Sequence, residues 1–175
     1  ENYNEERAMA RYEKAVDEWK NTKKGRQPKR PRHPHMSKRY PGNLYCGMIT
    51  PLVPFGMKGV IWYQGEANSK TIETSKFYAT QLETLIESWR ELFDQGDLPF
   101  YFVQLPNFKD AQDEPVEARE TWPVIRESVY KVARLVPNTG MATTIDIGMA
   151  DNIHPYNKMD VGRRLARLAL NKGQI

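Results

Sequence analysis

The sequence is poor in the residues that build disulfide and metal-bound frameworks. Its one cysteine, Cys46, excludes a disulfide within the chain. Cys46 lies in an apolar stretch with no histidine or acid in a recognisable pattern around it, so we expect a small buried side chain. His33 and His35 are two residues apart but lack the further ligands of a zinc site. No apolar run reaches the roughly 18 residues that a membrane-spanning helix requires.

The beginning of the sequence also lacks two features. It has no initiator methionine, and residues 1–6 do not form a signal peptide. We therefore expect the chain to be an internal piece or a processed product of a longer protein. The absence of a signal peptide leaves the cellular compartment of that protein open.

What is present is typical of a globular domain of ordinary size. The chain has 175 residues, of which 39% are hydrophobic and 27% are charged. The net charge of +4 is uneven, because residues 20–39 contain nine lysines or arginines and no acid, whereas the remainder has 17 basic and 22 acidic residues. We predict one partial domain over residues 1–175. Within it, residues 1–40 form an inserted helix and basic loop, and residues 41–175 form the main α/β portion.

The basic segment, residues 20–39, allows two interpretations. Pro28, Pro31 and Pro34 exclude a regular helix there. Lysine and arginine can neutralise phosphates, so one hypothesis is nucleic-acid binding. The other is a solvated loop on an acidic body, which the lack of interleaved aromatic residues favours.

Apolar periodicity predicts alternating strands and helices along the chain. The predicted strands are residues 59–63, 100–105 and 140–145. The predicted helices are residues 4–20, 76–94, 122–136 and 157–171, with a buried irregular segment or short helix at 44–55 and a polar loop at 107–118. This order predicts an α/β fold with a parallel sheet. The first strand is an unbroken apolar run, which is typical of a central strand buried on both faces.

Sites in parallel α/β sheets form beyond the carboxyl ends of the strands. Residues 64–66 follow the first predicted strand, and residues 151–154 follow the third. We therefore expect these polar segments to meet at one edge of the sheet, although they lie far apart in the sequence.

Asp151 and His154 are three residues apart, just before the last predicted helix. In a tight turn the carboxylate could hold one imidazole nitrogen and leave the other free as a base. Pro155 disfavours a helical backbone at His154, and Asn157 can cap the following helix with Asp160 as partner. The alternative is a turn aspartate beside an ordinary surface histidine.

Gln64, Gly65 and Glu66 stand where the chain leaves the first strand. The Gln64 amide can donate to a developing oxyanion, and Gly65 permits a ligand to approach the main chain closely. Glu66 could hold the loop by accepting hydrogen bonds, or less readily act as a general base. The alternative is a polar strand end without a function.

Three segments resemble the sialate O-acetylesterases, a family within the wider SGNH hydrolase group. Residues 60–68, Val-Ile-Trp-Tyr-Gln-Gly-Glu-Ala-Asn, resemble the family's GVIWYQGESN segment. Residues 43–52 resemble its LYNGMIAPL stretch, with Cys46 where asparagine is usual. Residues 146–166, which contain Asp151-Asn152-Ile153-His154-Pro155, resemble its terminal block.

The resemblance implies a flavodoxin-like SGNH fold, a three-layer sandwich with a parallel sheet, and hydrolysis of acetyl esters on sugars such as sialic acid. By this resemblance His154 is the general base, Asp151 its orienting acid, and Gln64 an oxyanion donor, with Gly65, Glu66 and Asn68 beside it in the substrate-binding segment. It implies no metal and no cofactor. It also implies a secreted, periplasmic or lysosome-like location.

The family's nucleophilic serine block is not found in these 175 residues. None of the serines has that context, including Ser69, which is nearest the matched segment; the others are Ser37, Ser75, Ser88 and Ser128. We expect the nucleophile and at least one N-terminal strand to come from a second polypeptide or from a missing N-terminal segment. The alternative is a non-catalytic carbohydrate-binding or interaction module with the same fold.

Overall fold

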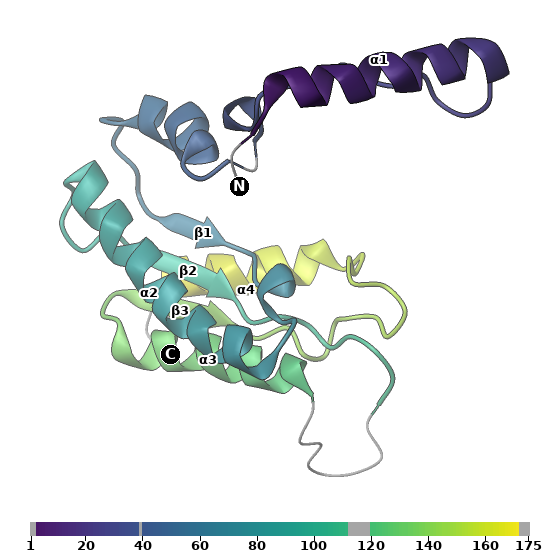
Figure 1. Cartoon of the computed structure of the whole chain (residues 1–175). Coiled ribbons are helices and arrows are strands. Elements are labelled where there is room, and N and C mark those ends of the chain that lie inside the picture. The colour runs from purple at the N-terminus through teal and green to yellow at the C-terminus, as the bar shows by residue number, and fades with distance from the viewer. Residues whose placement is uncertain (1–2, 39, 112–119, 172–175) are drawn as a thin grey trace. The chain divides into compact units, whose positions relative to one another are not determined.

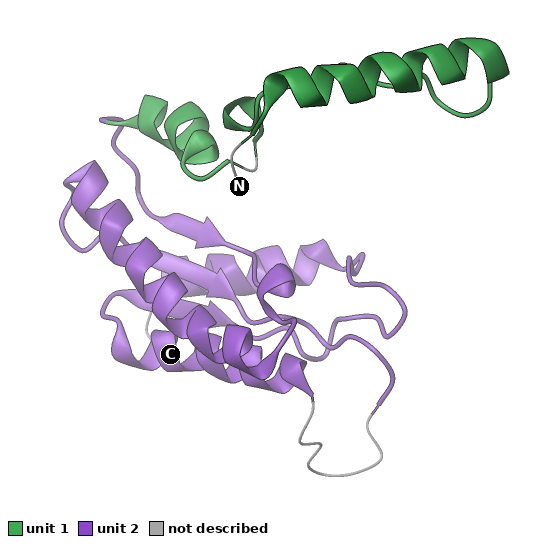
Figure 2. Cartoon of the chain, viewed as in Figure 1, with its two compact units in different colours: residues 1–53 green, residues 54–175 purple. Residues whose placement is uncertain are grey.

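The computed structural model describes residues 3–38, 40–111 and 120–171. The chain separates into two compact units, unit 1 (Glu1–Val53) and unit 2 (Pro54–Ile175), shown in Figure 2. Arg39 of the basic segment and most of the predicted loop 107–118 lie outside the described residues. The organisation into a single partial domain with an insertion stays a prediction.

Unit 1 begins with the predicted N-terminal helix, α1 (Glu5–Thr22). The Asn4 side chain accepts a hydrogen bond from the backbone N–H of Arg7 at 2.8 Å and so caps the helix. The acids Glu5 and Glu6 lie in the first turn, where they complement the positive end of the helix dipole. The helix ends at Lys23, which adopts a left-handed conformation with φ of 51°.

After α1 the chain has no long element in unit 1, and no described residue of this unit is fully buried. Short helical turns follow at η1 (Pro34–Met36), η2 (Tyr45–Ile49) and η3 (Thr50–Leu52). The prediction of a short helix in residues 44–55 is confirmed, but its burial is wrong, and so is the burial of Cys46, which is exposed. One helix and a few turns provide too few apolar neighbours to enclose these side chains.

Unit 2 is the α/β portion, and its elements confirm the predicted order (Figure 1). The strands are β1 (Val60–Trp62), β2 (Phe100–Val103) and β3 (Thr139–Ala142). The helices are η4 (Glu66–Asn68), α2 (Ile72–Phe93), α3 (Thr121–Leu135) and α4 (Lys158–Leu170). Within the described ranges, no helix has both the length and the apolarity needed to cross a membrane.

The sheet has the order β1-β2-β3, and both strand pairs are parallel. All four residues of β2 are buried, so β2 is the central strand of the described sheet. The prediction of a central β1 is wrong, because β1 lies at the edge and Ile61 is 70% exposed. An apolar run does not reveal on its own whether a strand has neighbours on both sides.

Successive side chains of β2 point to opposite faces of the sheet and enter two cores. Phe100 and Phe102 pack with residues of α2 and α3, including Ile86 and Ile125. On the other face, Tyr101 and Val103 pack against α4. Figure 1 shows α2 and α3 together on one side of the strands and α4 on the other, which is the predicted three-layer arrangement.

Candidate active site

The loops that follow β1 and β3 meet at the carboxyl end of the sheet, as the sequence predicts. The ammonium group of Lys158, the first residue of α4, lies 4.7 Å from the centroid of the Tyr63 ring. This is a cation–π contact, and Tyr63 immediately precedes Gln64. The start of α4 and the polar end of β1 are therefore neighbours in space.

The turn that carries Asp151 and His154 is anchored by the apolar residues between and after them. Ile153 packs against the core, and Pro155 is buried, whereas Asp151 and His154 are exposed. The backbone N–H of His154 donates to the Asn152 side chain at 2.9 Å. Among the described contacts, no hydrogen bond joins the Asp151 carboxylate to the His154 imidazole. The structure thus brings acid and base into one turn, and their pairing stays a prediction.

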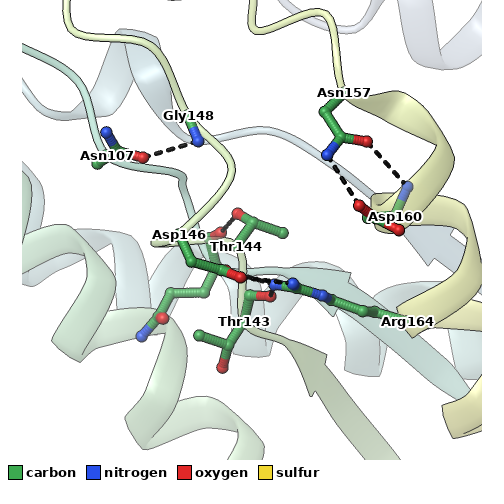
Figure 3. Close-up of polar contacts among 9 residues, drawn as sticks. Asn107, Thr143, Thr144, Asp146, Gly148, Asn157, Asp160 and Arg164 are labelled. Carbon is green, nitrogen blue, oxygen red and sulfur yellow. Dashed lines mark hydrogen bonds and ion pairs between the residues drawn. The ribbon is translucent and has the colours of Figure 1, made fainter.

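The loop between β3 and this turn is clamped to α4 by Arg164, as Figure 3 shows. The Arg164 guanidinium donates to both carboxylate oxygens of Asp146, at 2.6 and 2.7 Å, and to the carbonyl of Thr143 at 2.6 Å. Because two hydrogen bonds join the guanidinium and the carboxylate, they fix the relative orientation of the two groups as well as the distance between them. The hydrogen bonds from Arg164 lower the pKa of Asp146 to about 2, and the same contact raises the pKa of Arg164.

The same loop is also fixed to the loop that follows β2. The backbone N–H of Gly148 donates to the Asn107 side-chain oxygen at 2.7 Å (Figure 3). The N–H of Lys109 donates to the Ala150 carbonyl at 2.9 Å. Gly148 fits against Asn107 only because it has no side chain, since a Cβ there would lie 2.0 Å from the Asn107 carbonyl oxygen. The chain just before Asp151 is therefore held on two sides.

Asn157 caps α4, as the sequence predicts. Its side-chain oxygen accepts from the backbone N–H of Asp160 at 3.2 Å, and its side-chain nitrogen donates to the Asp160 carboxylate at 2.8 Å. This second bond is the main cause of the lowered pKa of Asp160. The cap fixes the point at which the turn with His154 becomes helix.

At the end of β1, Gln64 is held by side chains of α2 and η4. Its amide nitrogen donates to Asn68 at 2.8 Å, and its amide oxygen accepts from the Tyr78 hydroxyl at 2.9 Å. Asn68 in turn donates to Gln81 at 2.9 Å. Gly65 has a φ of 144°, a conformation that favours glycine.

Glu66, two residues after Gln64, is half-buried. Burial raises the pKa of Tyr63, and the negative charge of Glu66 raises it further. The Glu66 carbonyl accepts the Ser69 hydroxyl at 2.8 Å, and the Ser69 carbonyl accepts the Thr121 hydroxyl at 2.6 Å. The loop that contains Glu66 is therefore tied to the start of α3 through its backbone, and a role of the Glu66 carboxylate in holding the loop stays a prediction.

A surface hollow of about 230 Å³ lies where β1 faces α2. Its lining combines uncharged amides with aromatic rings and includes Trp62, Gln64, Asn68, Tyr78 and Gln81. The amides offer hydrogen bonds, and the indole offers a flat apolar surface. None of these groups is charged.

The serines of unit 2 have other roles in the structure. The hydroxyls of Ser69 and Ser88 donate to the carbonyls of Glu66 and Leu85. Ser75 and Ser128 are buried within α2 and α3. In the part of the chain that the structure describes, no group of three or more His, Cys, Asp or Glu side chains is arranged to hold a metal ion.

Sequence reasoning missed several residues that build this site. It assigned no role to Tyr78 or Arg164, which lie in the predicted helices 76–94 and 157–171. A polar role for Tyr78 could have been expected, because the hydroxyl of a buried tyrosine usually finds a hydrogen-bond partner. No sequence signal pairs Arg164 with Asp146 or Asn107 with Gly148.

Parallel strands, helices on both faces and polar loops beyond the strand ends define an α/β protein with three layers. A family model for the sialic acid-specific acetylesterases, a family of carbohydrate esterases, matches residues 8–171. The chain therefore belongs to that family. This confirms the resemblance seen in the sequence.

Individual relatives agree with this assignment. The sialate O-acetylesterases of Mus musculus and Homo sapiens are each 35% identical in an alignment of 136 positions, and each alignment covers 70% of this chain. The chain spans about a quarter of the length of these curated relatives, 24% and 25% respectively.

Solved structures show the same fold. A carbohydrate acetylesterase from Xanthomonas citri has 48% identity and a TM-score of 0.64 over 73% of this chain and 28% of that one. A protein from Arabidopsis thaliana, at 21% identity and a TM-score of 0.52, covers 66% of this chain and 45% of its own and shares the fold.

Proposed function

We propose that this chain supplies the base and an oxyanion donor of a carbohydrate O-acetylesterase that removes acetyl groups from O-acetylated sialic acid or a related sugar. The observation that carries the proposal is the contact between Lys158, at the start of α4, and Tyr63, at the end of β1, in a chain of this family. The contact supports a common site for Gln64 on one loop and His154 on the other.

In the proposed reaction a serine hydroxyl attacks the acetyl carbonyl carbon while His154 accepts the hydroxyl proton. Asp151 orients the imidazole and stabilises its protonated form. The tetrahedral oxyanion accepts a hydrogen bond from the Gln64 amide. Collapse expels the sugar oxygen, which takes the proton from His154. Water then attacks the acetyl-enzyme, with His154 again as base, and acetate leaves.

We propose further that the serine comes from residues outside these 175, on a second polypeptide or an N-terminal segment. The different roles of the unit 2 serines support this idea. The position of β1 at the edge of the described sheet, with the Ile61 side chain 70% exposed, also supports this idea, because an edge strand can pair with a further strand. Mass spectrometry of the native and then the denatured protein would reveal a tightly held second chain.

Acetate release from an O-acetylated sugar by the full-length protein tests the function. His154→Ala is expected to lower kcat by about 10³–10⁴-fold or more while the protein stays folded, because the serine loses its base. His35→Ala, an exposed histidine of unit 1, is the matched control. Turnover near that of the wild type in the His154 variant would refute the assignment. Sugar binding without acetate release, with the partner present, would favour the non-catalytic module.

A further inference from the structure

The amide of Gln64 is the middle of a chain of hydrogen bonds that begins at an indole. The Trp62 ring N–H donates to the Tyr78 hydroxyl oxygen at 3.3 Å. The Tyr78 hydroxyl lies 2.9 Å from both the carbonyl oxygen and the amide oxygen of Gln64. The chain continues from the Gln64 nitrogen to Asn68 and ends at Gln81.

This series of hydrogen bonds has a direction. An indole nitrogen can only donate, so the Tyr78 oxygen accepts there, and its own proton is directed at the two oxygens of Gln64. Tyr78 is 3% exposed, and burial raises its pKa to about 12, against the opposite effect of the Trp62 hydrogen bond. The hydroxyl therefore keeps its proton at neutral pH.

The direction decides which end of the Gln64 amide faces the site. With its oxygen fixed on Tyr78, the nitrogen is turned toward Asn68, and one of its two N–H groups makes that bond. The other N–H remains to donate to an oxyanion. A half-turn of the amide would present oxygen to the developing negative charge, which would raise the energy of the transition state.

We propose that Tyr78, itself positioned by Trp62, is a positioning residue that fixes the Gln64 amide with its nitrogen toward the reacting carbonyl. This inference rests on the proposed esterase function, because it assigns Gln64 as an oxyanion donor. It predicts that the hydroxyl of a buried helix residue controls the rate of the reaction without contacting the substrate.

The test compares Tyr78→Phe with two controls in the full-length protein. Removing one oxyanion donor lowers kcat by about 10²–10³-fold, and disordering the donor is expected to lower it by about tenfold to a hundredfold, with KM within about twofold of the wild type. Tyr130→Phe, at an exposed position of α3, removes the same hydroxyl without touching Gln64. Leu82→Ala, one turn along α2 in the core, loosens the packing without removing a hydrogen-bonding group.

A second readout separates the inference from the function on which it rests. In protein labelled with ¹⁵N-glutamine, the side-chain amide signal of Gln64 should shift and broaden in Tyr78→Phe, and it should keep its position in Leu82→Ala. If kcat of Tyr78→Phe falls only in proportion to the loss of folded protein, as is expected for Leu82→Ala, the positioning role of Tyr78 is refuted. An unchanged Gln64 signal would also overturn it, even if the wild-type protein releases no acetate and the proposed function fails.

Discussion

Gly148→Ala should be one of the most damaging single-methyl changes in this chain. The added Cβ would lie 2.0 Å from the Asn107 carbonyl oxygen, 2.4 Å from its side-chain oxygen and 2.8 Å from its backbone nitrogen. Real Cβ contacts are rarely closer than 3.0 Å, so the two loops must separate by about an ångström. Rotation of the Asn107 side chain would relieve only one of these clashes, because the other two are with backbone atoms.

The cost can be estimated from the contacts that this movement breaks. The Gly148–Asn107 hydrogen bond and the neighbouring Lys109–Ala150 hydrogen bond are each worth about 1 kcal/mol, and leaving a partly buried polar group unpaired costs about 1–3 kcal/mol more. We expect the free energy of unfolding to fall by about 2–4 kcal/mol. In the complete enzyme, a shift of about 1 Å near Asp151 is enough to lower turnover by about a hundredfold.

Urea denaturation of the chain, followed by circular dichroism, measures this effect. The matched control is Gly162→Ala, because Gly162 lies within α4 and a Cβ there meets nothing within 4 Å. That change should stabilise the protein by about 0.5–1 kcal/mol, since alanine is the better helix former. Equal free energies of unfolding for the two alanine variants would show that the contact between the loops is not as tight as described.

Two further predictions concern single groups. Ser75 is fully buried, and its hydroxyl has no hydrogen-bond partner among the described residues, so Ser75→Ala should raise the free energy of unfolding by about 1 kcal/mol. A lower stability of this variant in thermal unfolding would mean that the hydroxyl has a partner. Asp146 has a folded-state pKa of about 2, below its ordinary value of 3.8, so its carboxylate stabilises the folded state above pH 3.8 and this contribution is lost as the pH falls through about 2. The stability difference between the wild type and Asp146→Asn should accordingly be constant above about pH 4 and vanish near pH 2 in an acid titration. A difference that persists at pH 2 would exclude the Arg164 hydrogen bonds as its source.

The sequence predicted the order of elements because helix and strand periods are local properties. Strands β1 to β3 and helices α1 to α4 lie close to their predicted positions, and Asn157 caps α4 as expected. Helix α2 begins at Ile72, four residues before the predicted start, because Thr71 and Thr74 form a capping box without the usual glutamate. The apolar stripe alone does not extend to that first turn.

What the sequence could not predict depends on long-range pairing. The place of β1 at the edge follows from which strands pair, and an apolar run is compatible with either position. The clamp between Arg164 and Asp146 and the contact of Asn107 with Gly148 join residues that are distant in the chain and carry no mutual pattern. The positions of Asp151, His154 and Gln64 were predicted from motifs, whereas the groups that hold Gln64 emerged only from the fold.

The turn before α4 also determines which kinds of sequence change it can accept. Its side chains alternate, with Ile153 and Pro155 facing inward and His154 and Tyr156 facing solvent. Exchange of an outward side chain leaves this alternation intact. Insertion or deletion of one residue between Asp151 and Pro155 would reverse it, turning the imidazole toward the core and an apolar group toward water. In this segment, the number of residues is therefore more tightly constrained than the identity of the side chains that face solvent.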